Sequence, residues 1–474
     1  MPVAQASYHH RSSGCFLLFL FAVIFIASLI DAAPALAASL NQSSDKQTTT
    51  TDGPSVTVNG YFNARYTFRS AETASGDIAR DQDVYGELRI DLTAPKSGTY
   101  EFHFMGNVRS DLDGHRDIHT YYPLEDIGDT GQQSTMGNVY EAHLDLNDPF
   151  PRVTQIRLGR QAGTRDEQVF FDGIALEVRP VPKINLTVYG GAAVHFYEIS
   201  RSEGDDSLAG VGIDLYPTSL TGMSLDYLTV KDARNYLTLT DVRNDLVSLK
   251  LWQRFGENVK ATAKVRYQDS DYRDVSLRLL GSFPRSAFEF GAVYFRQFNT
   301  QVQQVNELSP FWDVMGQTDP FQTIELKMRK FLGTRYTVDL GYFSRAMLKS
   351  ADTGTFNQDF SRGTAAFTIA DFLTADLSLT LSGDQWSSDG NDAVSGAADI
   401  SYRFKKKGSM SAGTYYSMYK YDDFFQLTGQ DRVRTYYVNA RLSLAHSYML
   451  TCGYEFEKGI DTFNIMKVGL RYDF

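Results

Sequence analysis

Apolar and polar residues alternate along most of this chain, and this period of two constrains the fold more than any other feature. Over residues 56–69 one set of alternate positions is mainly apolar, and the interleaved positions are mainly polar or charged. The apolar set is Val56, Val58, Gly60, Phe62, Ala64, Tyr66 and Phe68. Alternation with period two places successive side chains on opposite faces of an extended strand. A run of this length is long enough to cross a bilayer at a tilt, which takes about 9–11 residues.

The same alternation recurs over residues 84–92 and 100–109 and continues for more than 400 residues. One large closed sheet fits so long a pattern better than several sandwiches, each of which would bury its apolar face. Mean hydropathy is only -0.30, and aromatic residues reach 13%. A membrane barrel gives this combination, because only every second strand residue faces lipid. We therefore predict an all-β fold, a transmembrane antiparallel up-and-down β-barrel.

Connections between the predicted strands alternate between tight and long. Tight turns occupy segments such as 95–98, 180–183 and 405–408, whereas residues 111–137 and 299–320 form long polar connections. Short turns at one end and long loops at the other are typical of outer-membrane barrels. The segments predict about 22 strands, within a range of 18 to 24. An even number places both termini at the short-turn side, which faces the periplasm.

The N-terminus has the pattern of an export signal. Residues 16–30 are apolar and uncharged, and Ala35-Leu36-Ala37 is a small-x-small cleavage site. We predict a signal peptide over 1–37, with an uncleaved anchor as the alternative. Residues 38–54 are polar and low in complexity, and we expect a flexible periplasmic lead that is too short to form a plug domain. Residues 55–474 then form the barrel, and the expected location is the outer membrane of a Gram-negative bacterium.

Two segments resemble known families. The chain ends in alternating apolar residues, Val468, Leu470, Tyr472 and Phe474. This ending resembles the C-terminal signature of bacterial outer-membrane proteins, which implies that Phe474 belongs to a signal read by the barrel insertion machinery. The hairpin over 155–179 has Leu158-Gly159-Arg160-Gln161 and Phe171-Asp172-Gly173 at its core. It resembles a hairpin in porin-like families, including alginate-export-type channels, where it presents polar residues toward the pore. The alternative is a rim hairpin held by an ion pair between Arg160 and Asp172.

If the apolar faces meet lipid, the charged faces line an aqueous lumen. The first strands predict a wall of both signs, here called the mixed wall: Arg65, Glu87, Arg89, Asp91, Glu101, His103, Arg109, Glu141, His143, Asp145, Arg157, Glu177 and Arg179. The middle strands predict a basic wall: Lys250, Arg254, Lys260, Lys264, Arg266, Arg278, Lys327 and Arg329. Charged lumen residues set the selectivity of a pore, because low-dielectric walls focus their field. The alternative is that these charges only pair across strands and stiffen the barrel.

Other features exclude functions or leave them open. The net charge of -11 does not change when residues 1–37 are removed, and this argues against a nucleic-acid partner. Cys452 is the one cysteine that remains, so no internal disulfide forms; we expect it on the lipid face. No nucleophile motif, phosphate loop or CxxCH motif is present, so we predict neither an enzyme nor a covalent haem. Residues 111–137 hold His115, His119 and several carboxylates, but the spacing matches no defined ligand set, and we predict no metal or cofactor.

The pattern as a whole predicts a porin-like channel in which small hydrophilic solutes, anionic or zwitterionic, diffuse across the outer membrane. Its expected partners are outer-membrane lipid, the insertion machinery and the solutes. Residues 111–137 and 299–320 are long enough to fold inward and narrow the pore. An alternative function is a barrel within a larger complex, either for polymer export or as a sheath around a multihaem cytochrome located in the periplasm or outside the cell.

Overall fold

The computed structural model describes residues 56–72, 76, 78–94, 99–113, 124, 135–163, 165–167, 169–194, 206–232, 242–299, 319–349, 358–388, 391–404, 407–417, 432–444, 447–459 and 461–474. The predicted signal peptide and periplasmic lead lie outside these residues, as do most of the two long connections at 111–137 and 299–320. Within the described residues, no helix is long and apolar enough to span a bilayer.

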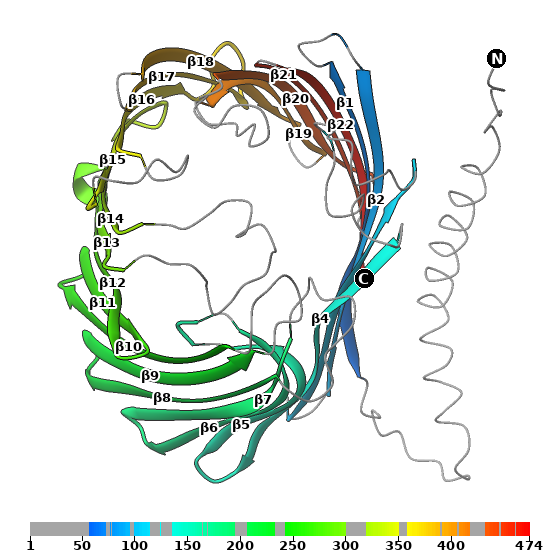
Figure 1. Ribbon diagram of the computed structural model, residues 1–474. Helices are drawn as coiled ribbons and strands as arrows, with labels where there is room; N and C mark the ends of the chain where they lie inside the picture. The colour runs from blue at the N-terminus through cyan, green and yellow to red at the C-terminus, as the bar shows by residue number, and fades with distance from the viewer. Residues whose placement is uncertain are drawn as a thin grey trace, which may run out of the picture.

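Twenty-two strands form one sheet that closes on itself, which confirms the predicted fold class and strand number (Figure 1). The first eleven are β1 (Thr57–Glu72), β2 (Ile78–Thr93), β3 (Tyr100–Asp111), β4 (Thr135–Phe150), β5 (Val153–Ala162), β6 (Phe170–Val181), β7 (Ile184–Ala193), β8 (Ser207–Thr218), β9 (Thr221–Asp232), β10 (Val242–Phe255) and β11 (Val259–Gln268). The others are β12 (Asp271–Phe283), β13 (Phe288–Gln297), β14 (Phe321–Leu332), β15 (Tyr336–Met347), β16 (Phe360–Ile369), β17 (Leu377–Ser388), β18 (Asn391–Arg403), β19 (Gly408–Ser417), β20 (Val433–Ser443), β21 (Tyr448–Lys458) and β22 (Thr462–Asp473).

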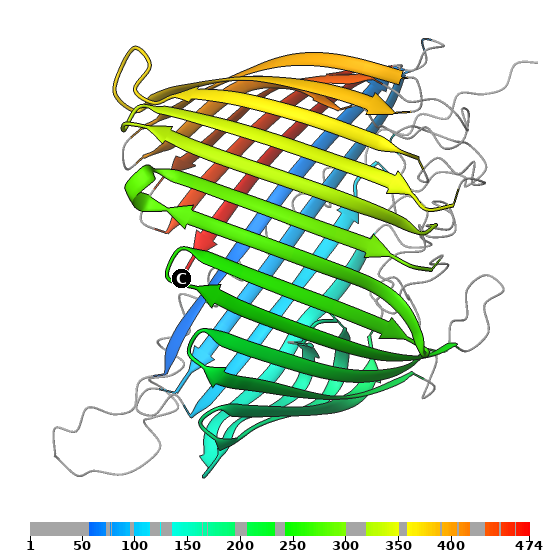
Figure 2. The same ribbon diagram turned by 90° about the vertical axis from the view of Figure 1, so that its left-hand side faces the viewer.

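Each strand pairs antiparallel with its neighbours in the chain, and β22 pairs with β1 to close the ring. The strands run at a tilt to the barrel axis (Figure 2). Phe474 completes the closure: its N–H donates to the Gly60 carbonyl over 3.1 Å, and the Gly60 N–H donates back to the Phe474 carbonyl over 3.0 Å. A side chain at Gly60 would overlap the Phe474 ring, since a Cβ there would lie 2.7 Å from its Cζ.

The two ends of the barrel differ in the length of their connections. At one end, 23 residues separate β3 from β4 and β13 from β14, whereas at the other end two to seven residues separate neighbouring strands. A one-turn 3-10 helix, Pro284–Ser286, lies in one of the short turns. Both termini of the barrel lie at the short-turn end, as the even strand number requires. Not every connection at the long-loop end is long. For example, Asp269 and Ser270 join β11 to β12 with positive φ angles of 52° and 77°, which suits a two-residue hairpin.

Apolar residues at alternate positions are exposed on the outside of the sheet. Leu251, Leu277, Leu326 and Val438 are each at least 40% exposed, and their sequence neighbours point to the opposite face. Such exposure would be costly in water and is what lipid contact requires. Cys452 lies on this outer face, opposite Ala440 on β20, as predicted.

The ring is not equally paired all the way round. β18 and β19 are paired at five positions, Asp399–Arg403 with Ser409–Gly413, the fewest for any two neighbouring strands among the described residues. Between this ladder and the start of β18, two arginines contact β18 directly: Arg434 on β20, and Arg432, which precedes β20. Arg434 donates to the Gly396 carbonyl and to Ser395 Oγ, each over 2.8 Å, and Arg432 donates to the Asp392 carbonyl over 3.1 Å.

Candidate pore constriction

The connection between β5 and β6 turns into the barrel instead of extending away from it (Figure 1). Arg165, Asp166 and Glu167 lie at its tip, and each of these consecutive residues contacts charged or polar groups on the inner face of β8–β12. We call these three residues the inward loop. Because a loop inside a barrel reduces its free cross-section, this is the candidate constriction.

Arg165 binds two carboxylates of the opposing wall. Its Nη1 lies 2.7 Å from Asp214 Oδ2 on β8, and its Nε donates to Asp226 on β9. The guanidinium side chain is only 10% exposed, so these are buried charge pairs, and removing one partner would leave the other uncompensated. Burial opposes the charge of Arg165, but the hydrogen bonds and charges of Asp214 and Asp226 outweigh burial and raise the pKa of Arg165.

Gly212 on β8 makes room for this pair. A Cβ at this position would lie 2.5 Å from the Arg165 Cζ and 2.5 Å from Asp226 Oδ1, closer than real atoms approach. Gly210, two residues earlier on the same face, similarly admits the Tyr189 ring, since a Cβ there would lie 2.6 Å from Cε1. The glycines of β8 therefore permit the inward loop and its supporting ring to lie against the wall.

Asp166 accepts a hydrogen bond from the Ser248 hydroxyl and lies 3.7 Å from the Lys250 Nζ, both on β10. Burial alone would raise the pKa of Asp166. The Ser248 hydrogen bond and the positive charges of Lys264 and Lys250 outweigh burial, so the pKa is lowered. Asp166 is therefore ionised at neutral pH and held by the basic wall.

Glu167 binds two arginines. Arg266 Nη1 on β11 lies 3.1 Å from Glu167 Oε1, and Arg273 on β12 donates to the same oxygen. Both guanidiniums also contact Asp274, which is 1% exposed; the Nε distances are 2.8 Å from Arg266 and 3.0 Å from Arg273. Two arginines and two carboxylates thus form a closed ionic cluster that anchors the loop.

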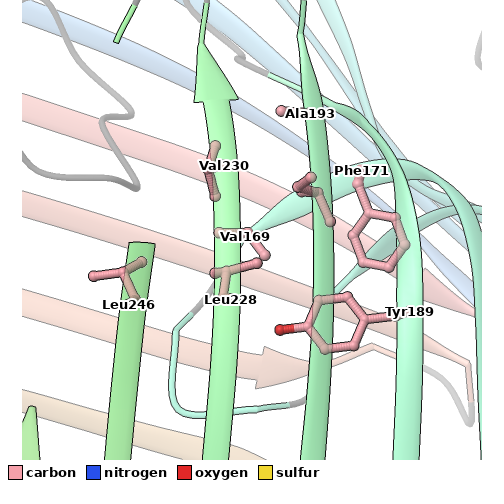
Figure 3. Packing of buried hydrophobic residues seen from close by; sticks show 8 residues of the cluster. Val169, Phe171, Tyr189, Ala193, Leu228, Val230 and Leu246 are labelled. Atoms are coloured by element: carbon pink, nitrogen blue, oxygen red, sulfur yellow. The ribbon is translucent and has the colours of Figure 1, made fainter. Parts of the chain in front are cut away.

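An apolar cluster lies beside the inward loop on the inner face of the barrel (Figure 3). It consists of Val169, Phe171, Tyr189, Ala193, Leu208, Leu228, Val230 and Leu246, all less than 7% exposed. Val169 lies two residues after the loop, so its burial helps fix the loop's base. Burial of one such side chain contributes about 1.5–3 kcal/mol. Sequence alternation assigned apolar residues to lipid, and this inner cluster is an exception to it.

The basic wall lies on the strand face opposite exposed Leu251, Leu277 and Leu326. Its members differ in their partners. Lys250 and Arg266 bind the inward loop, Lys327 pairs with Glu325, and Arg329 Nε lies 2.6 Å from Asp339 Oδ1. Lys264 lies near Asp166 and is buried beside Arg266.

Besides Lys264, which lies near Asp166, three cations of the basic wall have no ion pair with a carboxylate in the described part of the chain: Arg254, Lys260 and Arg278. Arg254 and Lys260 instead lie over the Trp252 ring, 5.9 Å and 5.3 Å from its centroid. Arg278 is exposed on the same face of the sheet. This part of the wall therefore presents cations that form no ion pair with the described carboxylates.

In the mixed wall, by contrast, many charged side chains pair with neighbouring groups. This fits the alternative that such charges pair across strands and stiffen the barrel. The hydrogen bonds and ion pairs of this wall are Tyr61 and Tyr85 to Glu87, Arg89 to Asp91, Arg109 to Asp83, Arg157 to Asp145, His103 to Asp91, and Arg179 to Asn185. Arg65 lies over the Tyr85 ring at 4.9 Å, and Glu141 and Glu177 interact electrostatically with Arg157. Its charges are mostly compensated within the wall.

The Arg160–Asp172 pair in the 155–179 hairpin is formed, with Nε and Nη2 at 2.7 Å and 2.8 Å from the two carboxylate oxygens. These residues share a strand face with exposed Leu158 and Ile174, so the pair lies on the outer face of the barrel. Arg157 and Glu177 of this hairpin lie on the opposite, inner face, and Arg165, Asp166 and Glu167 contact the inner wall from its tip. The alternation of the sequence does not reveal this contact, because three charged residues between two strands are also typical of a solvent-exposed loop.

An aromatic hollow of about 780 Å³ forms part of the inner surface across β14–β20. Its lining includes Phe343, Phe360, Trp386, Tyr415 and Tyr437. Arg362 lies over the Trp386 ring at 4.4 Å and donates to Asp384 over 2.7 Å. Aromatic faces beside paired charges can bind organic solutes that carry both apolar and ionic groups.

No protein-family model and no curated protein sequence matches the chain. Among solved structures, the P pilus usher (PapC) translocation pore is 10% identical, with 87% of this chain and 99% of that chain covered and a TM-score of 0.48. OpdQ of Pseudomonas aeruginosa is 10% identical, with coverage of 88% and 98% and a TM-score of 0.43. A BenF-like porin from Pseudomonas fluorescens Pf-5 is 12% identical, with coverage of 88% and 98% and a TM-score of 0.44. The fold assignment rests on the strand pairing of the chain itself.

Proposed function

We propose that this protein is an outer-membrane channel of a Gram-negative bacterium, exported by residues 1–37, through which small hydrophilic solutes diffuse. The observation that carries the proposal is a closed barrel with apolar residues exposed outside and charged residues inside. A water-filled interior is the environment in which unpaired lumen charges such as Arg254 and Lys260 are stable. The short-turn end, with both barrel termini, faces the periplasm.

The channel favours anionic or zwitterionic solutes. Support comes from the difference between the two walls: arginines of the mixed wall pair with its carboxylates, as Arg157 does with Asp145, whereas Arg254, Lys260 and Arg278 present cations without a carboxylate partner. Low-dielectric walls strengthen the field of such charges in the lumen. The aromatic hollow around Trp386 and Arg362 supports organic solutes in particular.

The test is ion selectivity in planar bilayers. We expect the purified barrel to conduct and, under a KCl gradient, to give a reversal potential of the sign for anion preference. The double variant K260E/R278E moves this potential toward cation preference. The control R285E reverses one charge in the exposed short turn Pro284–Ser286 and leaves the potential unchanged. Absence of conductance would refute the channel, and cation preference in the unsubstituted protein would refute the selectivity.

A further inference from the structure

We propose that Glu101, His103, His143 and Asp145 form a binding site for a divalent transition-metal ion on the inner wall of β3 and β4. The site is independent of the solute that the channel passes. It lies within the mixed wall, away from the inward loop, and uses histidines that the pore function leaves without a role.

The strand register brings the four side chains together. His103 on β3 lies directly opposite His143 on β4, and Glu101 lies directly opposite Asp145. Within each strand the two residues are two apart, so all four project from the same face. One ligand atom each from His103, His143 and Asp145 can be chosen so that all three lie within 4.8 Å of one another. A small ion bound between them requires only small side-chain shifts, because Zn–N bonds are about 2.0–2.1 Å long.

Each imidazole has its Nδ1 atom committed to an oxygen acceptor. His103 Nδ1 lies 2.6 Å from Asp91 Oδ1, and His143 Nδ1 lies 3.3 Å from the carbonyl oxygen of Arg160. An acceptor at Nδ1 fixes the tautomer with the proton there, which leaves the Nε2 lone pair free. Metal-binding histidines in proteins are oriented in this way by carboxylates and backbone carbonyls.

Both free Nε2 atoms then face carboxylate oxygens. His103 Nε2 lies 3.5 Å from Glu101 Oε2 and 3.9 Å from Asp145 Oδ2, and His143 Nε2 lies 3.8 Å from Asp145 Oδ1. Lone pairs that point at anionic oxygens repel one another unless a cation lies between them. His143 is only 5% exposed, so water has little access to offset this repulsion at its ring.

The surroundings favour a cation. Asp91, Glu101, Glu141 and Asp145 are countered by two guanidiniums, those of Arg89 and Arg157, so carboxylates exceed arginines by two. Arg157 and Gln155 hold Asp145 at 2.7 Å and 3.0 Å and thereby fix its orientation. His103 and Glu101 are 21% and 30% exposed toward the lumen, which gives an ion a route to the site.

Two imidazoles with carboxylate oxygens suit Zn²⁺, Ni²⁺ or Cu²⁺ better than Ca²⁺ or Mg²⁺, which prefer oxygen ligands alone. The competing explanation for the same geometry is a proton: a doubly protonated imidazole would also satisfy the facing carboxylates. The test must therefore separate a bound metal from a protonated histidine.

The experiment titrates the metal-free, detergent-solubilised full barrel, without a histidine tag, with ZnCl₂ in a calorimeter at pH 7.5, and with CoCl₂ by visible spectroscopy. We expect one Zn²⁺ per chain and cobalt absorption bands that indicate nitrogen and oxygen ligands. The variant H103Q/H143Q should weaken binding by at least 100-fold. The matched control H195Q/H446Q removes two histidines elsewhere in the chain and should leave the affinity unchanged.

Folding of each variant is checked by its shift in electrophoretic mobility on heating, which reports an intact barrel. Unchanged Zn²⁺ affinity in a folded H103Q/H143Q barrel would overturn the proposal. So would the absence of Zn²⁺ binding to the folded, unsubstituted barrel, since the facing carboxylates would then be satisfied without a metal ion. Loss of conductance alone affects the channel proposal and leaves this one standing.

Discussion

Gly212 on β8 lies so close to Arg165 of the inward loop that any side chain at position 212 would overlap the guanidinium. A Cβ there would lie 2.5 Å from the Arg165 Cζ. The backbone of one strand is therefore shaped to the side chain of a residue 47 positions earlier in the chain. Adding a single methyl group at position 212 therefore tests whether this contact holds the inward loop in place.

The substitution G212A should displace Arg165 and weaken its pairs with Asp214 and Asp226. Forcing extra volume into a packed site costs about 1–3 kcal/mol. We expect a larger and noisier single-channel conductance, because the loop no longer holds one position in the lumen, and a lower unfolding temperature. The control is G363A on β16, where a Cβ would have no atom within 4 Å. Equal conductance in G212A and G363A would contradict the assignment of the constriction.

Acid should release the inward loop through Asp166. Its pKa is lowered from an ordinary value near 3.8. A lowered pKa in the folded state means that the ionised carboxylate stabilises the seated loop above pH ~4, and that this stabilisation is lost as the pH falls through the lowered pKa. We therefore expect conductance to be constant from pH 7 to about pH 4 and to rise below it.

The variant D166N tests this assignment, because its amide cannot titrate and gives no charge attraction to Lys250 and Lys264. Its conductance at pH 7 should already approach the acid value of the unsubstituted barrel, with a smaller change on acidification. An acid transition of the same size in both proteins would show that another carboxylate of the wall controls the loop.

The terminal Phe474 should matter for assembly more than for conduction. Its backbone exchanges two hydrogen bonds with Gly60, and its ring lies over that glycine on the outer face. We expect F474A to lower the fraction of barrel that becomes heat-modifiable during refolding and the amount inserted in cells, while channels that do form conduct normally. Y342A, which removes another exposed aromatic ring from the outer face, is the control. Normal insertion of F474A would exclude Phe474 as part of the insertion signal.

Alternation along the sequence was sufficient to predict the closed sheet, its strand number and the side of each strand that carries Lys250, Arg254 and Lys260. These are local properties, since the period of two assigns each side chain to a face without knowledge of its neighbours. The two-residue turn at Asp269 and Ser270 interrupts the series of longer connections at its end of the barrel. It has no Gly or Asn, the residues that most strongly signal such a turn.

The inward loop could not be predicted in the same way. Ser248 and Arg273, which bind Asp166 and Glu167, lie 82 and 106 residues further along the chain, and only closure of the sheet brings them opposite the loop. The inward position of Phe171 and Leu228 also depends on residues that are distant in the sequence. Where a loop fills part of the lumen, an apolar side chain that faces inward packs against protein and is stable there. The run Arg165-Asp166-Glu167 next to Gly163 and Val169 was the available signal, because three charges between small and apolar residues suit an anchored loop.

The five-position ladder between β18 and β19 makes the circumference mechanically uneven. Along most of the ring, neighbouring strands are joined by backbone hydrogen bonds that do not depend on residue type. Beyond Asp399, the described part of this seam is instead spanned by the side chains of Arg432 and Arg434. A closed sheet under tension opens first where the fewest hydrogen bonds join neighbouring strands. Here two of the residues that form such bonds do so through their side chains. Point substitutions at Arg432 or Arg434 can therefore strengthen or weaken the contacts at this seam without altering the rest of the barrel.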